Sequence, residues 1–164
     1  MADPPRSLAS EDLSIVRAKP EDVPAIKSMV VAAYTKYIQR IGKPPAPMMT
    51  DYDQLLKTED VFVLRENNNS SVVGSIVLDH DRDSKSIKIN NLVVDPAAQG
   101  RGYGRVLMKY AEDVAHAQGL TAITLFTNVK MYENLGLYAK LGFIETGRRV
   151  EDGYERVYFR KDLK

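Results

Sequence analysis

The chain has 164 residues, of which 44% are hydrophobic and 27% charged, and its formal net charge is +1. This length favours one domain with its own core, and the near-neutral charge argues against a nucleic acid or a membrane as partner. The absence of cysteine excludes disulfides, thiolate catalysis and cysteine-ligated zinc. Residues 1–11 lack the apolar segment of a signal peptide, so we predict a flexible arm there, one domain over 12–164 and a cytoplasmic location.

In the first half of the chain, hydrophobic periodicity predicts two helices and four strands. A strand over 13–18 precedes a helix over 23–41, whose apolar residues recur every three or four positions. The proline-rich segment 43–49 is predicted to be stiff and extended, and a short helix ending at Lys57 follows it. The other strands of this half are predicted at residues 61–65, 72–78 and 87–94, with a turn at 79–85.

The second half begins with a helix–strand–helix pattern and ends with two strands. Predicted helices cover residues 102–118 and 128–141, and predicted strands cover 121–127, 143–146 and 157–160. Short connections favour antiparallel neighbours, whereas the helix between two strands requires a parallel crossover. We therefore predict an α/β domain built on a mixed, mostly antiparallel sheet that is flanked by helices.

The most informative stretch is residues 95–104, between an apolar strand and an amphipathic helix. Gly100, Gly102 and Gly104 occupy alternate positions just where the helix begins. Glycine lets the backbone approach a ligand closely, and a helix N-terminus presents free N–H groups and a positive dipole end. This arrangement suits a phosphate.

Two nucleotide-binding motifs do not fit this turn. A dinucleotide fingerprint would need a third glycine at position 105, which is Arg105. A P-loop would need Gly-Lys-Ser/Thr after the glycines, and no such tripeptide follows. A plain strand-to-helix turn is the remaining alternative, although one turn does not need three alternating glycines.

Two motifs resemble the GNAT superfamily of N-acetyltransferases. Residues 93–104 are similar to its acyl-CoA signature, with Gln99, Gly102 and Gly104 at the motif positions, and 137–143, Leu-Tyr-Ala-Lys-Leu-Gly-Phe, are similar to its second motif. The resemblance covers nearly the whole chain from Leu13. It implies a GNAT fold with about four helices, in which the fourth and fifth strands splay apart, and it implies acetyl-CoA as co-substrate without a metal.

The resemblance also implies where the coenzyme binds. The backbone N–H groups of residues 99–104 would surround the pyrophosphate, and the pantetheine arm would add like a strand to the edge near 92–94. The implied coenzyme-binding residues are Leu92, Val93, Val94, Gln99, Gly100, Arg101, Gly102, Tyr103, Gly104 and Asn134.

For catalysis, the resemblance implies Tyr138 as the general acid that protonates the leaving thiolate, and simple packing of this tyrosine is the alternative. The general base is less evident. Phe126 stands near the position where some members carry a glutamate, and Met131 stands where members often carry an asparagine. We hypothesise that Asn90 or Asn91 orders a water that takes the proton, with Glu133 as a weaker alternative.

The remaining candidate residues favour structural roles. His80 and His116 stand alone, and His116 lies opposite the apolar stripe of its helix. Residues 79–83 resemble the start of a calcium loop, but the glycine and glutamate that such a loop needs later are missing. We predict Tyr34 and Tyr37 to be core residues that partly line the substrate entrance.

The sequence therefore predicts acetyl transfer from acetyl-CoA to a primary amine of a small molecule. We expect the acceptor to approach residues 34–49, the segment that differs most within this superfamily. A protein N-terminus or lysine remains an alternative acceptor, and a non-catalytic acyl-CoA-binding module remains an alternative class. We expect no nucleic-acid or membrane partner and leave a homodimer open.

Overall fold

The computed structural model describes residues 12–164, so the arm predicted at residues 1–11 lies outside the described residues. One seven-stranded sheet forms its centre, in the order β1-β2-β3-β4-β5-β7-β6. The strands are Leu13–Arg17 (β1), Asp60–Glu66 (β2), Val72–Asp81 (β3), Ser86–Val94 (β4), Ala122–Asn128 (β5), Ile144–Glu151 (β6) and Tyr154–Asp162 (β7). The α-helices are Val23–Ile41 (α1), Tyr52–Thr58 (α2), Tyr103–Ala117 (α3) and Tyr132–Lys140 (α4).

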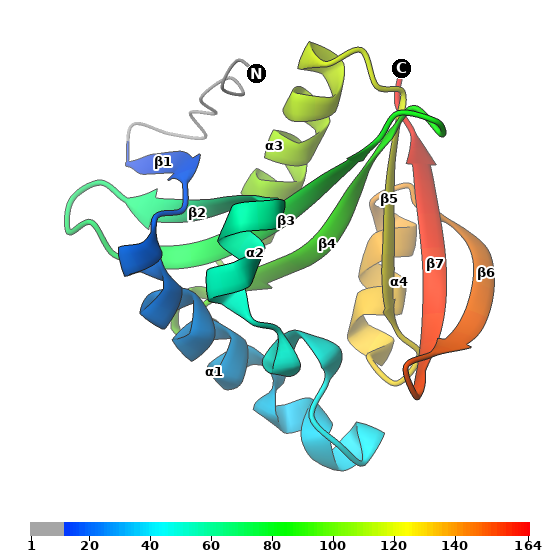
Figure 1. Cartoon of the computed structure of the whole chain (residues 1–164), viewed down its shortest axis with the longest axis horizontal. Coiled ribbons are helices and arrows are strands. Elements are labelled where there is room, and N and C mark those ends of the chain that lie inside the picture. The colour runs from blue at the N-terminus through cyan, green and yellow to red at the C-terminus, as the bar shows by residue number, and fades with distance from the viewer. Residues whose placement is uncertain (1–11) are drawn as a thin grey trace.

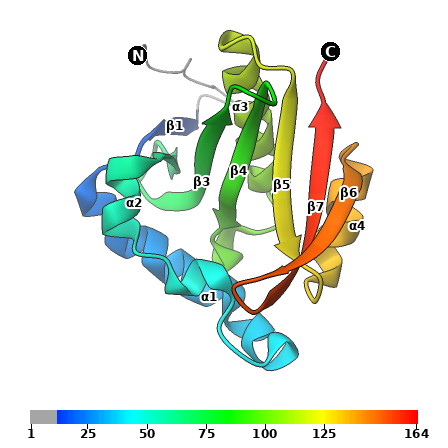
Figure 2. The same cartoon turned by 45° about the vertical axis from the view of Figure 1, so that its right-hand side comes forward.

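The sheet is mixed and mostly antiparallel, which confirms the predicted fold class. Among its neighbouring pairs only β4 and β5 run parallel, and they are joined by the α3 crossover. Helices α1 and α2 cover one face of the sheet, whereas α3 and α4 cover the other (Figures 1 and 2). The larger core lies between α3 and the sheet, and a second core lies under α1. Within the described residues no helix combines the length and apolar character that a bilayer crossing needs.

Strands β4 and β5 separate halfway along their length, as the resemblance to the GNAT superfamily implies. Their pairing ends at Ile89 and Leu125, although β4 continues to Val94. At this point the register of β4 on β3 shifts and skips Asn90. Such a bulge bends a strand and increases its twist, while β5 stays paired with β7 through Asn128. The two strands therefore diverge from their paired ends (Figure 1), and β4 keeps a free edge at residues 90–94.

Most predicted elements agree with the structure, but the connecting segments differ. Helix α1 has the predicted bounds and ends at Gly42, whose φ of 92° is left-handed. The segment predicted to be extended contains a 3-10 turn at Ala46–Met49 (η2), because proline also fixes a φ that suits this helix. The predicted turn at 79–85 is also wrong in part, since β3 continues to Asp81 and pairs His80 with Ile87.

The last two strands are longer than predicted. They meet at a two-residue turn, in which Asp152 and Gly153 both have positive φ, as a tight hairpin requires. Strand β6 is an edge strand with mostly exposed residues, so its sequence lacks clear apolar alternation. Helix α4 starts later than predicted because Asn128 still belongs to β5, where it pairs with Arg156.

Candidate functional site

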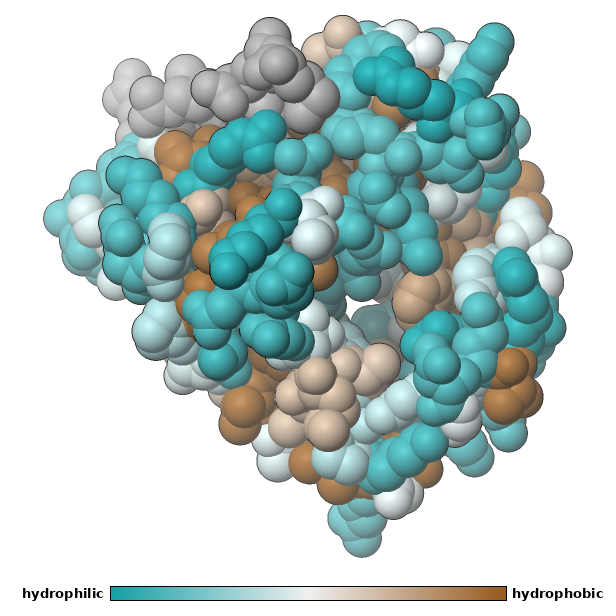
Figure 3. All heavy atoms as spheres, viewed as in Figure 1, coloured by the Kyte–Doolittle hydropathy of each residue, from teal (hydrophilic) through white to brown (hydrophobic). Residues whose placement is uncertain are grey.

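Two pockets lie along the free edge of β4. The first, which we call the turn-side pocket, is next to the glycine turn and the start of α3, and its volume is about 400 Å³. The second, the hairpin-side pocket, lies between the segment before α2 and the β6–β7 hairpin, and its volume is about 70 Å³. The surface is hollowed between the α1–α2 side and the β5–β7 side of the molecule (Figure 3). Four residues line both pockets: Tyr34, Leu92, Asn134 and Tyr138.

Nine of the ten residues implied for coenzyme binding line the turn-side pocket. The exception is Arg101, whose side chain is 56% exposed and lies 3.6 Å from the carboxylate of Glu66. Gly100 and Gly102 have φ values of 87° and 80°, so glycine relieves backbone strain at both positions. Gly104 differs, because its φ is not positive. A Cβ there would lie 4.0 Å from Val94 Cγ2, so glycine keeps the pocket open beside β4.

Helix α3 begins directly at this pocket. Gly102 is its N-cap, and the first backbone bond of the helix runs from the Val106 N–H to the Gly102 carbonyl at 3.1 Å. The N–H groups of residues 103–105 have no partner within the helix and add to its positive end. A phosphate at this position would therefore meet several backbone donors at once.

Sequence reasoning missed two cations of the turn-side pocket. Arg105 follows the last glycine and Lys36 belongs to α1, and both line the pocket. Arg105 has no ion pair within residues 12–164. Its position one residue after the glycines was a usable signal, whereas nothing near Lys36 in the sequence points to the turn some 60 residues away.

Tyr138 lies where the two pockets meet. Its ring packs against Phe143 and Phe159, with ring centroids 5.8 Å apart in both pairs. Burial, together with the nearby Tyr37 hydroxyl, raises the pKa of Tyr138 to about 12. The phenol is therefore neutral at physiological pH and has a proton to donate.

A chain of hydrogen bonds crosses the wall of the hairpin-side pocket. The Tyr34 hydroxyl donates to Asn91 Oδ1 at 3.2 Å, and Asn91 Nδ2 donates to the Tyr52 hydroxyl at 3.2 Å. The Tyr52 hydroxyl in turn donates to the Pro47 carbonyl at 3.1 Å. Burial raises the pKa of both tyrosines, that of Tyr52 to about 12. Both ends of the Asn91 amide are thus engaged, which leaves Asn90 as the better placed of the two asparagines to hold a water.

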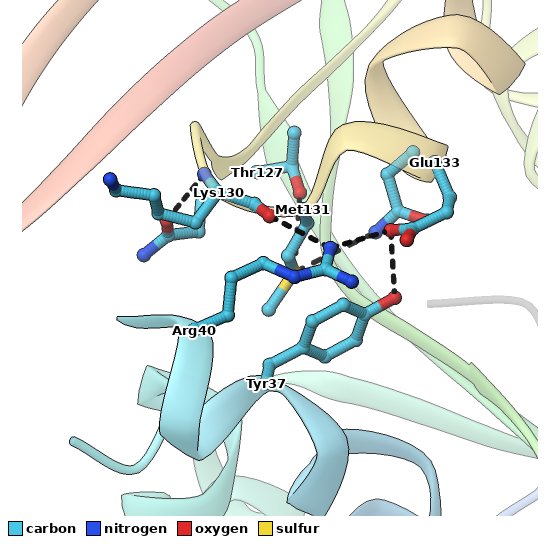
Figure 4. A network of polar contacts seen from close by, with 8 residues as sticks. Tyr37, Arg40, Thr127, Lys130, Met131 and Glu133 are labelled. Atoms are coloured by element: carbon cyan, nitrogen blue, oxygen red, sulfur yellow. Dashed lines mark hydrogen bonds and ion pairs between the residues drawn. The ribbon is translucent and has the colours of Figure 1, made fainter. Parts of the chain in front are cut away.

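Glu133 is bound to α1 rather than free to act as a base. Its carboxylate accepts from Arg40 at 3.0 Å and from the Tyr37 hydroxyl at 3.5 Å (Figure 4). The hydrogen bond from Arg40 is the main cause that lowers the pKa of Glu133 to about 2. Arg40 also donates to the Lys130 carbonyl at 3.0 Å. This cluster links the end of α1 to the start of α4, and a carboxylate of such low basicity accepts protons poorly.

The two histidines and the acidic turn lie apart from both pockets. His80 Nε2 lies 3.0 Å from Asp60 Oδ2, at the end of β3 opposite to the glycine turn. His116 is exposed on α3. Among residues 12–164 no group of three or more histidine, aspartate or glutamate side chains is placed to hold a metal. Tyr37 is buried, as predicted, and lines the turn-side pocket, whereas Tyr34 is half-buried and lines both pockets.

Solved structures of acetyltransferases share this architecture. A chimeric spermidine N-acetyltransferase SpeG from Vibrio cholerae and hSSAT aligns with a TM-score of 0.71 and 20% identity, over 93% of this chain and 96% of that one. The ribosomal-protein-S18-alanine N-acetyltransferase from Escherichia coli aligns with a TM-score of 0.65 and 21% identity, over 93% and 94% of the two chains. These likenesses establish the GNAT fold.

Sequence comparison adds the family. Residues 25–143 match the Acetyltransferase (GNAT) family, and the chain belongs to it. An IAA acetyltransferase of Azospirillum brasilense is 33% identical over 94 residues, which are 57% of this chain and 61% of that protein. A probable N-acetyltransferase 14 of Xenopus tropicalis is 29% identical over 97 residues, which are 58% and 47% of the two. The chain thus spans about half the length of these relatives.

Proposed function

We propose that this chain transfers an acetyl group from acetyl-CoA to the primary amine of a small molecule. The observation that carries the proposal is the meeting of two pockets at Tyr138, one of them beside a glycine-rich turn whose geometry suits a phosphate. A thioester in the first pocket and an amine in the second would react at this junction. The relatives named above are acetyltransferases, which supports the same reaction.

The lining of the turn-side pocket supports binding of the pyrophosphate and the pantetheine arm of the coenzyme. The pyrophosphate would accept from the N–H groups at the start of α3, and Arg105 and Lys36 would balance phosphate charge. The free edge of β4 at 92–94 offers backbone groups to the amides of the pantetheine arm. An arm that follows this edge would bring the thioester carbonyl near Tyr138, which lines the same pocket as Leu92.

The reaction requires a neutral amine and a proton for the departing sulfur. The amine nitrogen attacks the thioester carbonyl carbon, forms the C–N bond and produces a tetrahedral oxyanion. When the C–S bond breaks, the Tyr138 hydroxyl donates its proton to the thiolate. The nitrogen loses one proton to solvent, assisted by a water near Asn90, and Tyr138 regains one, so protons balance.

A bridge across the hairpin-side pocket favours a small acceptor over a protein. The Tyr154 hydroxyl donates to the Pro44 carbonyl at 2.6 Å, and Lys43 Nζ lies 4.1 Å from the centroid of the Tyr154 ring. The β6–β7 hairpin thereby contacts the segment between α1 and α2. Tyr154 also lines the pocket, so this contact would obstruct an extended peptide more than a small molecule.

Release of free thiol from acetyl-CoA tests the proposal directly. A panel of small primary amines should support release, and peptides with a free N-terminus or lysine should support it at a rate at least tenfold lower. Binding of acetyl-CoA without thiol release for any amine would instead favour a sensor module. Faster release with peptides would favour a protein acetyltransferase.

A further inference from the structure

We infer that the acceptor carries a carboxylate and that Arg156 binds it. This inference rests on the proposed function, because it concerns the pocket that would receive the amine. Arg156 belongs to β7, and its register partner on β5 is Asn128. Both residues line the hairpin-side pocket, together with Tyr138.

The guanidinium of Arg156 is held in place by stacking. It lies 4.3 Å from the centroid of the Phe126 ring, and its side chain is only 13% exposed. Lys88 Nζ lies 4.9 Å from the centroid of the same ring and adds positive charge nearby. A cation fixed on an aromatic ring loses little conformational freedom when it binds a planar anion.

Among the described residues that line the hairpin-side pocket, only Arg156 has a charged side chain. The other polar groups there are amides and hydroxyls, including Asn90, Asn128 and Thr127. An acceptor with a second ammonium group would meet no carboxylate in this pocket. An acceptor with a carboxylate would meet one guanidinium, which is the group best shaped to bind it in a bidentate way.

The donors of Arg156 are not saturated by the protein. Its Nη1 lies 3.8 Å from Glu151 Oε1 and 3.9 Å from Asp152 Oδ2, which is too far for hydrogen bonds. Glu151 Oε1 is itself buried without a hydrogen-bond partner in the part of the chain that the structure describes. Stacking on Phe126 holds the guanidinium, and neither carboxylate is close enough to use its N–H groups, so these can donate to a ligand.

Tyr138 and Arg156 line the same pocket, so one acceptor can bring its amine to Tyr138 and its carboxylate to Arg156. Arg156 also lines an adjoining pocket of about 230 Å³, together with Phe126, Asn90 and Asn91, which leaves room for the rest of the acceptor. The class that fits is an amino acid or a similar amino-carboxylic acid.

The test compares each amino acid with its own carboxamide, which keeps the skeleton and removes the negative charge. The value of kcat/KM is measured for both acceptors and expressed per neutral amine, because the two nitrogens differ in pKa. We expect the carboxylate to be preferred by about tenfold to a hundredfold, the usual range for a hydrogen-bonded charged group. Arg156→Gln should abolish the preference while the KM for acetyl-CoA stays within threefold.

Arg149→Gln is the matched control. Arg149 belongs to the same hairpin and stacks on Tyr158 at 4.1 Å, but it does not line the hairpin-side pocket. This variant should keep the full preference. If Arg156→Gln does not fold, Arg156→Lys replaces it and should reduce the preference, because lysine lacks the bidentate geometry.

Equal kcat/KM for acid and carboxamide in the unaltered protein would overturn the inference. An unchanged preference in the Arg156 variant would also overturn it. Acetylation of neutral amines without a charge preference leaves the proposed function intact and removes only this inference. Failure of every amine, with acetyl-CoA still bound, would instead remove the proposed function.

Discussion

The hydroxyl of Tyr34 donates to Oδ1 of Asn91 at 3.2 Å and so joins α1 to the free edge of β4. The same hydroxyl lies 3.5 Å from the carbonyl oxygen of Leu92, the next residue on that edge. Asn91 also donates to Tyr52 at the start of α2. One side chain of β4 therefore positions two helices around the place where the pockets meet.

We expect Asn91→Ala to lower the free energy of unfolding by about 1–3 kcal/mol. The reason is that two partly buried hydroxyls, those of Tyr34 and Tyr52, each lose one hydrogen-bond partner. Urea denaturation of Asn91→Ala, Tyr34→Phe and the double variant measures the effect as a cycle. A coupling above about 0.5 kcal/mol is expected for residues in contact, and strictly additive losses would show that the bond contributes nothing.

Removing the Tyr138 hydroxyl should reduce kcat and leave coenzyme binding intact. A general acid typically contributes a factor of about 10²–10⁴, so we expect a loss of that size in Tyr138→Phe. The ring contacts with Phe143 and Phe159 do not involve the hydroxyl, so the fold and the Kd for acetyl-CoA should change little. Steady-state thiol release and calorimetric binding measure the two quantities separately.

Tyr132→Phe is the control for this variant. Tyr132 belongs to the same helix, is 57% exposed and lines neither pocket. The Tyr132→Phe variant should have the same kcat as the unaltered protein. A Tyr138→Phe enzyme with unchanged kcat would exclude this hydroxyl from proton transfer.

The parts of the site that the sequence predicts are those built from neighbouring residues. The glycine turn, the strand before it and the helix after it are contiguous, so their order and spacing already describe one end of the turn-side pocket. Tyr138 is found in the same way, from a short motif on α4. The splay of β4 and β5 follows from the resemblance, and the structure adds its local cause, the bulge at Asn90.

The acceptor side could not be predicted because its contacts are distant in sequence. Tyr154 and Pro44 are 110 residues apart and meet only when the β6–β7 hairpin folds toward the segment after α1. The length of that hairpin depends on a turn whose two residues both have positive φ, while its outer strand lacks apolar alternation. In the sequence, Arg156 therefore resembles an ordinary exposed charge. Only the folded structure shows that β7 places it beside Phe126.

Gly104→Ala should separate stability from coenzyme binding. Position 104 has no positive φ and its nearest neighbour for a new methyl group is Val94 Cγ2 at 4.0 Å, so the folded protein should not be destabilised. The methyl group would, however, occupy space beside the free edge of β4. We expect the Kd for acetyl-CoA to rise about tenfold, measured by calorimetry, with no fall in the unfolding midpoint.

Gly136→Ala provides the comparison, because it makes the same change in α4 where a Cβ meets nothing within 4 Å. This variant should gain up to about 1 kcal/mol from helix propensity and keep its affinity for acetyl-CoA. Equal affinities for the two variants would place the coenzyme away from Gly104.

The pH dependence of kcat/KM should follow the acceptor rather than a group of the protein. The pKa of Glu133 is lowered to about 2 and that of Tyr138 is raised to about 12, so neither changes protonation between pH 5 and 10. Tyr138 is thus protonated, as an acid must be, throughout this range.

At saturating acetyl-CoA, kcat/KM should rise with pH until the amine is neutral and then level off. With a second acceptor whose amine pKa is about two units lower, the rising limb of this pH profile should move to lower pH by the same amount. A limb near pH 4–5 that is the same for both acceptors would instead require a carboxylate base.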